Sequence, residues 1–554
     1  MPEAPARIRQ PSQALWPLQP HHAVWTAALL FLLVGLGLQI WRLTVLHASY
    51  DQGVLLQTMW SGLSGHPFQS TLSSQLSSEV VHDGLLPRLG YHRLGQHFTP
   101  TLVLWMPLVG LLGRWALPLV QVGLITAAGL VLHRLCRSLL PDRLSAAISL
   151  SFFGANAVIG PTWGNFTDLC QLPLCFFVLI LGIVERRWLL WLPAALLMPL
   201  IREDTGVVLA GIGLWLLLRD TQKRRLLAVG LMTWGLTWVV VCTNMLMPLF
   251  SDDNSRRFMI ENFGQYLGER REASSLEVLG QVVSSPLRLL AELVNPPGKT
   301  LVYLLGQTLP LAFVPLVAID AWLLAGLPLL GLLLAQGSND PLSINIRYTL
   351  LVAPGLFSGA VFWWSRHQPL FAQRRWRRLW TGAVLLSLLF TLTSNPNRSL
   401  SFLIPDSVDP WIYSPPMQRW QHSRRVHHQL ARIPKNASVS ATTFLVPHLA
   451  ERPVAIRFPK SIAWRDRAGA THPVDWIAAD LHWTLDYQKA FKGERGNLKR
   501  MVELLDPVPA GYGVVAVDDD LVLLQRGAPD SAGAQAKLSA LIQRARLALT
   551  PSQP

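Results

Sequence analysis

The first four hundred residues alternate between long apolar runs and short clusters of charged residues. A membrane-spanning helix needs about 20 predominantly apolar residues to cross a hydrocarbon core of about 30 Å. The first run, residues 24–46, meets this length, is too long for a signal-peptide core and is followed by no small-residue cleavage site. It predicts a retained first membrane helix. Ten further runs continue the pattern: residues 115–135, 146–160, 170–184, 188–201, 206–218, 226–250, 301–319, 322–335, 348–364 and 379–393.

The pattern therefore predicts a polytopic α-helical membrane protein with about eleven spans in residues 24–393. Several runs are shorter than a full span, so their helices must extend or lie obliquely. Only 15% of the residues are charged, whereas soluble proteins carry about 25%. The four cysteines lie in or beside apolar runs without metal-ligand spacing, which argues against a disulfide framework or structural zinc.

Charge orients the predicted spans, because loops on the cytoplasmic side are enriched in lysine and arginine. With a cytoplasmic tail over residues 1–23 and one crossing per run, the inner loops hold these basic clusters: Arg7/Arg9, Arg134/Arg137/Arg143, Arg186/Arg187, Arg219/Lys223/Arg224/Arg225 and Arg366/Arg374/Arg375/Arg377/Arg378. The formal net charge of +15 is thus distributed over span ends. This distribution indicates membrane lipids as partners and argues against nucleic acid.

The same orientation predicts three segments outside the membrane: residues 48–114, 251–300 and 394–554. A semi-apolar stretch at residues 98–112 lies in the first segment. A crossing there would export the downstream arginine clusters, so we predict a helix lying in the membrane interface.

The last segment, residues 394–554, alternates short strands with helices, which is typical of a small α/β domain. On this topology the domain is extracytoplasmic, and it contains no glycine-rich phosphate loop. The predicted strands are residues 438–442, 454–457, 476–481, 513–517 and 521–525, and the predicted helices include residues 496–505 and 532–549.

The segment directly after the first span carries the most informative polar residues: Tyr50, Asp51 and Gln57. A carboxylate at the outer mouth of a helix bundle has access to water and to lipid headgroups. It can act as a general base or bind a divalent cation. Alternatively, Asp51 caps a helix over residues 52–61.

Further polar residues fall on the same face under this topology. Arg202, Glu203 and Asp204 form a short outer turn, His97 opens the interfacial helix, and Asp168 lies in another outer loop. Structural alternatives remain, because Asp204 can cap the next helix and Arg202 can pair with Glu203. As a set with Asp51, these carboxylates and the imidazole would suit Mg²⁺ or Mn²⁺ ahead of Zn²⁺, with Asp51, His97 and Asp204 as the predicted ligands.

Arginines on the outer side are candidates for holding a phosphate, because guanidinium groups grip phosphate oxygens in pairs. Simple solvation or contact with anionic headgroups is the alternative for each. Arg347 stands out because Arg347 and Tyr348 lie at the mouth of a span, where the headgroup region begins. The candidates are Arg256, Arg257, Arg270, Arg271 and Arg347.

These residues carry a resemblance to a known bacterial membrane family. The phrase at residues 50–60, Tyr-Asp-Gln-Gly-Val-Leu-Leu-Gln-Thr-Met-Trp, resembles the pattern Tyr/Phe-Asp-x-Gly-x-x-x-Gln-x-x-Trp of the family catalogued as domain of unknown function 2079. Further similarities follow in order along the chain: Gly-Gln-His-Phe-Thr-Pro at 95–100, Arg-Glu-Asp-Thr-Gly at 202–206, Arg-Tyr at 347–348, Val-Ser-Ala at 439–441 and Val-Pro-His-Leu-Ala-Glu-Arg at 446–452.

The layout of that family is similar to the C-type (GT-C) glycosyltransferases, which use sugars linked to polyprenyl phosphate. The resemblance implies a bacterial plasma membrane location, an acidic catalytic or metal-binding residue at Asp51, and supporting roles for His97, Glu203 and Asp204. Many such enzymes carry two adjacent acidic residues in the first outer loop, whereas Gln52 follows Asp51 here. This departure puts metal dependence in doubt.

The leading hypothesis is therefore an inverting sugar transferase at the outer face of the membrane, in which Asp51, Glu203 and Asp204 are the candidate catalytic residues. Tyr50, Gln57, His97, Arg202, Arg256, Arg257, Arg347 and Tyr348 are the candidate substrate-binding residues. A non-catalytic transporter is one alternative, but the span interiors are nearly free of charge and show no repeated halves. An envelope-assembly protein is another.

Overall fold

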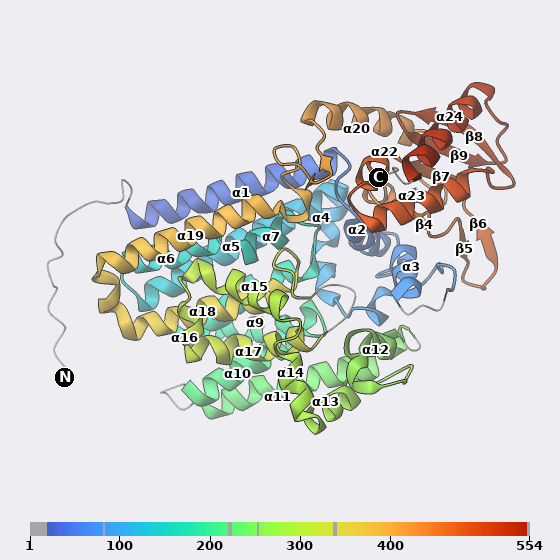
Figure 1. Cartoon of the computed structure of the whole chain (residues 1–554). Coiled ribbons are helices and arrows are strands. Elements are labelled where there is room, and N and C mark those ends of the chain that lie inside the picture. Colours follow the sequence, from blue (N-terminus) through green and yellow to red (C-terminus); the bar gives the residue numbers. More distant parts are fainter. Residues whose placement is uncertain (1–18, 81–83, 220–223, 252–253, 336–340, 551–554) are drawn as a thin grey trace, which may run out of the picture.

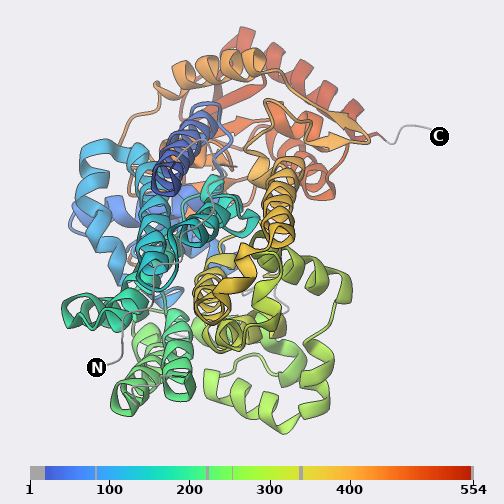
Figure 2. The ribbon, with the colours of Figure 1, turned by 90° about the vertical axis from the view of Figure 1, so that its left-hand side faces the viewer.

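The computed structural model describes residues 19–80, 84–219, 224–251, 254–335 and 341–550. A long body of helices leads into a smaller unit of strands and helices at one end (Figure 1). Seen from the opposite end, the helices of the body run side by side and the sheet lies behind them (Figure 2). The first helix runs the length of this body, so the segment that follows it emerges beside the C-terminal unit.

Within the described residues, four helical stretches are long and apolar enough to cross a membrane: Pro20–Thr44, Pro100–Leu139, Asp142–Trp163 and Arg225–Leu249. Four shorter apolar helices accompany them: Asp168–Val184, Trp188–Ile201, Thr205–Arg219 and Ile319–Leu334. Because apolar helices satisfy their own backbone groups, this architecture suits a hydrocarbon environment. The body consists of these main helices: α1 (Pro20–Thr44), α5 (Ala116–Leu139), α6 (Asp142–Phe153), α7 (Asn156–Trp163), α8 (Leu172–Val184), α9 (Trp188–Ile201), α10 (Thr205–Arg219), α11 (Arg225–Val241), α15 (Pro297–Thr308), α17 (Ile319–Leu334), α18 (Thr349–His367) and α19 (Arg374–Ser394).

Small residues allow the closest helix pairs. A Cβ built on Gly206 of α10 would lie 2.5 Å from the carbonyl oxygen of Gly235 of α11. A Cβ on Gly359 of α18 would lie 2.2 Å from the Cα of Ala321 of α17. In lipid there is no hydrophobic driving force between helices, so they associate through close packing of their backbones at small residues.

Two predicted spans are not continuous helices. The run at residues 301–319 contains α15, then a break at Ala312 and Phe313, whose φ angles are 50° and 61°, and a single turn, α16 (Val314–Val317). The run at residues 146–160 is divided between α6 and α7, because the helix is interrupted at Gly154. The predicted interfacial helix at residues 98–112 is a 3₁₀ turn followed by α4 (Met106–Leu112), which a positive φ at Gly113 separates from α5.

The C-terminal unit is built on a five-stranded sheet in the order β4-β3-β7-β9-β8. The three strands β3 (Val439–Thr442), β4 (Ala455–Phe458) and β7 (Trp476–Asp480) are parallel, and β9 (Leu521–Arg526) and β8 (Tyr512–Asp518) are antiparallel additions. The strands predicted from the sequence are thus present. The C-terminal unit also contains elements that were not predicted from the sequence, among them α20 (Pro416–Leu430), β1 (Ser407–Val408), β2 (Trp411–Ile412), β5 (Ala463–Arg465) and β6 (Thr471–Pro473).

The two faces of this sheet pack differently. Ile477 and Leu524 point into a core formed with α23 (Lys492–Leu505) and α24 (Ala532–Leu549). Ala441 and Ala478 belong instead to the large core that continues into the helical body. The sheet is therefore held to the body by shared apolar packing as well as by the connecting chain.

In the first segment predicted to lie outside the membrane, α2 (Tyr50–Leu63) contacts α3 (Thr71–Val80), and α3 packs against the edge strand β4. The Oγ1 of Thr71 donates to the carbonyl of Ala455 at 2.7 Å and accepts from its N–H at 3.2 Å. Gln75 makes the same pair of hydrogen bonds to the backbone of Arg457, at 3.1 and 2.5 Å. Side-chain amides and hydroxyls thus satisfy an edge that would otherwise be free to pair with another chain, and α2 is fixed against the C-terminal unit.

Candidate functional site

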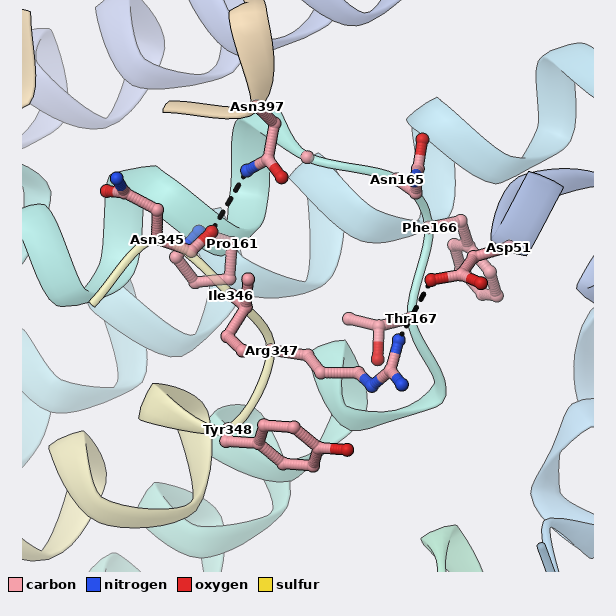
Figure 3. A pocket seen from close by; sticks show the side chains of 11 residues that line it. Asp51, Pro161, Asn165, Phe166, Thr167, Asn345, Ile346, Arg347, Tyr348 and Asn397 are labelled. Atoms are coloured by element: carbon pink, nitrogen blue, oxygen red, sulfur yellow. Dashed lines mark hydrogen bonds and ion pairs between the residues drawn. The ribbon is translucent and has the colours of Figure 1, made fainter. Parts of the chain in front are cut away.

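A cavity of about 150 Å³ lies where α2 begins, between two loops of the helical body (Figure 3). One wall is the loop after α7, with Asn165 and Thr167, and the other is the loop before α18, with Asn345 and Arg347. The Oδ1 of Asn345 is buried and has no hydrogen-bond partner in the described parts of the chain.

Asp51 lies in the first turn of α2 and forms one side of this cavity. Its Oδ2 accepts a hydrogen bond of 3.2 Å from Nη1 of Arg347, which reaches across the cavity (Figure 3). The helix begins at Tyr50, with Ser49 in the N-cap position, so Asp51 is not the N-cap residue. The carboxylate is 43% exposed and the guanidinium 31% exposed. The pair therefore remains open to a ligand.

A buried charge network lies next to residues that line the cavity, because Asp168 follows Thr167 and Arg202 contacts Tyr348. Arg202 is 2% exposed, and its Nε and Nη2 donate to the two carboxylate oxygens of Asp204. Its Nη1 lies 3.9 Å from Oδ1 of Asp168. Arg93 approaches the other oxygen of Asp168 at 3.8 Å. Asp168 is thus shared by two buried arginines. Charges taken out of water this far need partners, and each of these three residues has one.

His97 and Glu203 form a second pair in the same network. The Nδ1 of His97 lies 2.8 Å from Oε1 of Glu203, and Oε2 of Glu203 accepts the backbone N–H of Phe98 at 2.9 Å. Burial raises the pKa of Glu203, but His97 and these hydrogen bonds lower it by more, so the net pKa is below the usual value. Glu203 is therefore a carboxylate that orients His97.

Tyr348 connects the open pair to the buried network. The guanidinium carbon of Arg347 lies 5.3 Å from the centre of the Tyr348 ring, and that of Arg202 lies 5.4 Å from it. An aromatic face attracts cations at such distances. The ring therefore helps to hold two positively charged groups near one another at the cavity.

Two predicted substrate-binding residues lie away from the cavity. The hydroxyl of Tyr50 donates to the carbonyl of Leu72, and the guanidinium carbon of Arg457 lies 4.6 Å from its ring centre. The amide of Gln57 donates to Thr71 and to the carbonyl of Arg452, both at 3.1 Å. Both side chains are buried and fasten α2 to α3 and to the C-terminal unit.

The arginines predicted to bind phosphate also separate into groups. Arg347 lines the cavity. Arg256 is exposed and Arg257 half-buried on α12 (Asn254–Leu267), whereas Arg270 pairs with Glu277 at 3.4 Å. The cavity walls do not include these residues of the second outer segment. Among the arginines predicted to bind phosphate, Arg347 is the one that the fold brings to Asp51.

The predicted metal ligands Asp51, His97 and Asp204 face different partners, namely Arg347, Glu203 and Arg202. Within the described residues they do not form a group with metal-ligand spacing.

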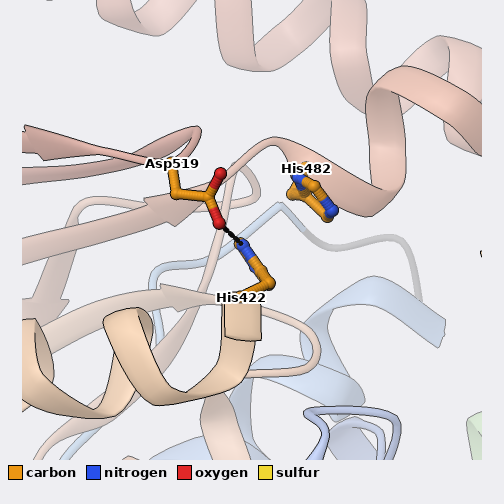
Figure 4. A group of neighbouring side chains, drawn as sticks. All are labelled: His422, His482 and Asp519. Carbon is orange, nitrogen blue, oxygen red and sulfur yellow. Dashed lines mark hydrogen bonds and ion pairs between the residues drawn. The ribbon is translucent and has the colours of Figure 1, made fainter. Parts of the chain in front are cut away.

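Three other side chains do gather closely enough for a metal ion: His422, His482 and Asp519 (Figure 4). The two imidazole rings are stacked, with centres 4.0 Å apart and planes 14° from parallel. Lone pairs in nearly parallel planes this far apart do not converge on one ion, so the geometry favours a proton instead. His422 bridges Asp519 at 2.8 Å and Asp480 at 3.0 Å. Burial lowers the pKa of His422, but the two carboxylates raise it by more, to about 9.

Several residues of the site were missed from the sequence. Arg93 is fully enclosed, and nothing in its sequence neighbourhood distinguished it from a solvated arginine. Asn165 joins the first span to the cavity wall, since its Oδ1 accepts from the N–H of Ser49 at 3.1 Å and from Arg42 at 3.4 Å. Asn397 donates to the carbonyl of Asn345 at 2.9 Å. Asn165 and Asn397 are asparagines in loops beside apolar runs, and this is the sequence signal that could have identified them.

The fold and the site together define a helical membrane protein with a polar, charge-lined cavity where its helices meet the C-terminal unit. The chain belongs to the family described as "Predicted membrane protein (DUF2079)", whose model matches residues 42–523. The match includes Asp51, the Arg202–Asp204 turn, Arg347 and most of the C-terminal unit. The family expected from the sequence motifs is thus confirmed. No curated protein matches the chain.

Proposed function

We propose that this protein is a sugar transferase of the GT-C type that acts on a polyprenyl-phosphate-linked donor at the outer face of a bacterial plasma membrane. The observation that carries the proposal is the Asp51–Arg347 pair, which is partly exposed and faces a cavity lined by polar groups. A general base and a phosphate-binding cation are the two groups that such a transfer requires.

The cavity volume of about 150 Å³ is below the roughly 300–1,000 Å³ of pockets that enclose a whole ligand. The cavity therefore suits the phosphate headgroup and the bond to be broken, while the polyprenyl chain would remain in lipid. Arg347 is within hydrogen-bond reach of Asp51, so a phosphate that takes over the guanidinium would release the carboxylate.

In the proposed step, Asp51 accepts the proton of an acceptor hydroxyl as its oxygen attacks the anomeric carbon of the sugar. The new C–O bond forms as the bond from the anomeric carbon to the phosphate oxygen breaks. Polyprenyl phosphate leaves with the electron pair, and Arg347 stabilises the charge that develops on it. A single displacement of this kind inverts the configuration at the anomeric carbon.

The network behind the pair has a positioning role in this proposal. Arg202 and Arg93 are buried and share Asp168. Because a 1 Å displacement of a reacting group can cost about 100-fold in rate, a rigid charge network behind Tyr348 and Arg347 would keep the phosphate site in register with Asp51. A divalent cation is not required by this arrangement, since arginines supply the positive charge.

The test is to replace Asp51 with Asn in cells and to measure glycolipid and glycan products at matched protein levels. We expect loss of the product, and partial recovery with Asp51→Glu. The matched control is Asp142→Asn, because Asp142 is a 74% exposed aspartate in the predicted inner loop after α5. Unchanged products in Asp51→Asn cells would refute the proposal. Export or assembly defects with normal transfer would favour a transporter or assembly protein.

A further inference from the structure

A second cavity, of about 250 Å³, lies in the C-terminal unit. Three parallel strands end at it: β3 at Thr442, β4 at Phe458 and β7 at Asp480. The carboxyl ends of parallel strands meet at one edge of a sheet, and the crevice outside that edge is where α/β folds bind ligands. The position alone therefore makes this cavity a candidate binding site.

The lining offers hydrogen-bond donors and acceptors in mixture. Arg457 and Asn497 donate, whereas the carboxylates of Asp480 and Glu494 accept, and Phe444 adds an aromatic surface. Threonine hydroxyls, which can do both, come from β3 and from α22 (His482–Tyr487). We propose that this cavity binds a saccharide, since sugar hydroxyls both donate and accept and a sugar ring presents C–H groups to an aromatic face.

A phosphate or another anion fits the same lining poorly. The two basic residues of the cavity, Arg457 and Lys460, already share the carboxylate of Glu79, which Lys460 approaches at 3.6 Å. Asp480 and Glu494 add two more carboxylates at the wall. An anion would be repelled by these carboxylates, because the two basic residues that could attract it are already paired with Glu79. A neutral polyhydroxyl ligand would not be repelled.

The polar groups of the cavity are held in place before any ligand arrives. Asp480 is buried, and its oxygens accept from Nε2 of His422 at 3.0 Å and from the N–H of His482 at 3.0 Å. Arg457 is fixed between Glu79 and the ring of Tyr50. Groups that need no ordering on binding contribute more of their interaction energy to affinity.

The cavity volume of about 250 Å³ lies near the lower end of the roughly 300–1,000 Å³ of small-ligand pockets, which suits a single sugar residue. Arg457 also contacts Tyr50, the residue before Asp51 in the first turn of α2. The first turn of α2 therefore supplies a lining residue of one cavity, Asp51, and contacts a lining residue of the other, Arg457. The saccharide site is inferred from its own lining and does not depend on transfer at Asp51.

The experiment uses the full-length protein in detergent on an immobilised array of mono- and oligosaccharides from bacterial envelopes. We expect retention of at least one saccharide and at least tenfold weaker retention by Asn497→Leu and by Thr484→Val. The control is Asn262→Leu, because Asn262 is a half-buried asparagine on α12, outside the cavity. Asp51→Asn should bind normally.

Three results would overturn the saccharide site: no retention of any arrayed sugar, equal retention by the two cavity variants, or displacement by inorganic phosphate at matched concentration. The last would identify an anion site. Loss of glycolipid product in Asp51→Asn cells together with absent saccharide retention would refute this inference alone. Normal product in those cells together with Asn497-dependent retention would refute the proposed transfer alone.

Discussion

Asp51 and Asp320 both lie in the first turn of a helix and both face arginines from distant parts of the chain. Their surroundings differ. Asp320, 1% exposed, accepts from Trp215 at 2.9 Å, from Arg219 at 3.2 Å and from Arg366. Among the described residues, Arg347 is the single ion-pair partner of Asp51, and 43% of the Asp51 side chain is exposed. A carboxylate paired with arginine is thus closed to solvent at Asp320 and open to solvent at Asp51.

The comparison suggests how to separate structural from functional charges in such proteins. A fully buried carboxylate that balances two arginines holds the structure together, and removing it leaves its partners unpaired. A carboxylate with one partner at a cavity can exchange that partner for a ligand. Activity should therefore depend on Asp51, and folding should depend on Asp320.

The largest expected effect is the loss of transfer in Asp51→Asn. General-base catalysis contributes about 10²–10⁴-fold in rate, whereas a partly exposed ion pair contributes only about 0.2–1 kcal/mol to stability. We therefore expect product formation to fall at least 100-fold while the melting temperature in detergent stays within about 2 °C. A large fall in melting temperature would place Asp51 in the structural class.

Asp320→Asn should give the opposite result. Its arginine partners Arg219 and Arg366 would lose the carboxylate they share, at a cost of about 3 kcal/mol in the free energy of unfolding. We expect a clear fall in melting temperature and in the amount of protein in the membrane. The specific activity of the folded remainder should be unchanged, and a selective loss of activity would break the comparison.

The protonated His422 cluster is a third, closed example, and it can be probed with pH. The pKa of His422 is about 9 in the folded protein, against about 6.5 in an unfolded chain. Because the folded pKa is the higher one, the stabilisation is complete below pH 6.5 and is lost as pH rises through 9. A difference of this size corresponds to about 3 kcal/mol.

Hydrogen exchange of α20 and of the β8–β9 turn, corrected for intrinsic rates, measures this loss. Protection should fall between pH 6.5 and 9.5 in the native protein and be independent of pH in His422→Gln. His472→Gln serves as the control, because His472 forms a half-exposed pair with Asp466. Equal pH dependence in native protein and His422→Gln would contradict the assignment of the proton.

The smallest effect is expected at Arg347. Lysine keeps the charge but lacks the planar fork that grips phosphate at two points. We expect Arg347→Lys to lower kcat/KM for the lipid-linked donor about tenfold, which corresponds to about 1.4 kcal/mol, through a higher KM and a lower kcat. Arg137→Lys, at a half-exposed arginine near the predicted inner surface, should leave both constants unchanged. Equal kcat/KM values for Arg347→Lys and the native protein would remove Arg347 from the donor site.

Local patterns made part of this architecture predictable. The helix at Ala532–Leu549 and the strand at Val439–Thr442 follow from apolar periodicity. Inner-loop charge predicted one outer face for Asp51, His97 and Glu203, and this orientation stays a prediction. Breaks such as the one at Ala312 and Phe313 depend on packing with distant helices, so a hydropathy run did not reveal them.

The contacts that define the site are also long-range. The motif around Gln57 predicts that this residue binds a substrate. Its amide instead donates a hydrogen bond to the carbonyl of Arg452, 395 residues away along the chain. Arg93 pairs with Asp168 from a different loop, and no local spacing indicates such a partner. The same motif therefore contains both a partly exposed carboxylate at a cavity, Asp51, and a buried side chain that holds the fold together, Gln57. The three-dimensional fold distinguishes the two.

The most direct test of the open site is release of polyprenyl phosphate by the purified protein in liposomes that contain a polyprenyl-phosphate-linked sugar and an acceptor. The native protein and Asp142→Asn should release polyprenyl phosphate in equal amounts with the glycosylated acceptor, and Asp51→Asn should release at least 100-fold less at the same folded fraction. Release by Asp51→Asn at the native rate would contradict the account.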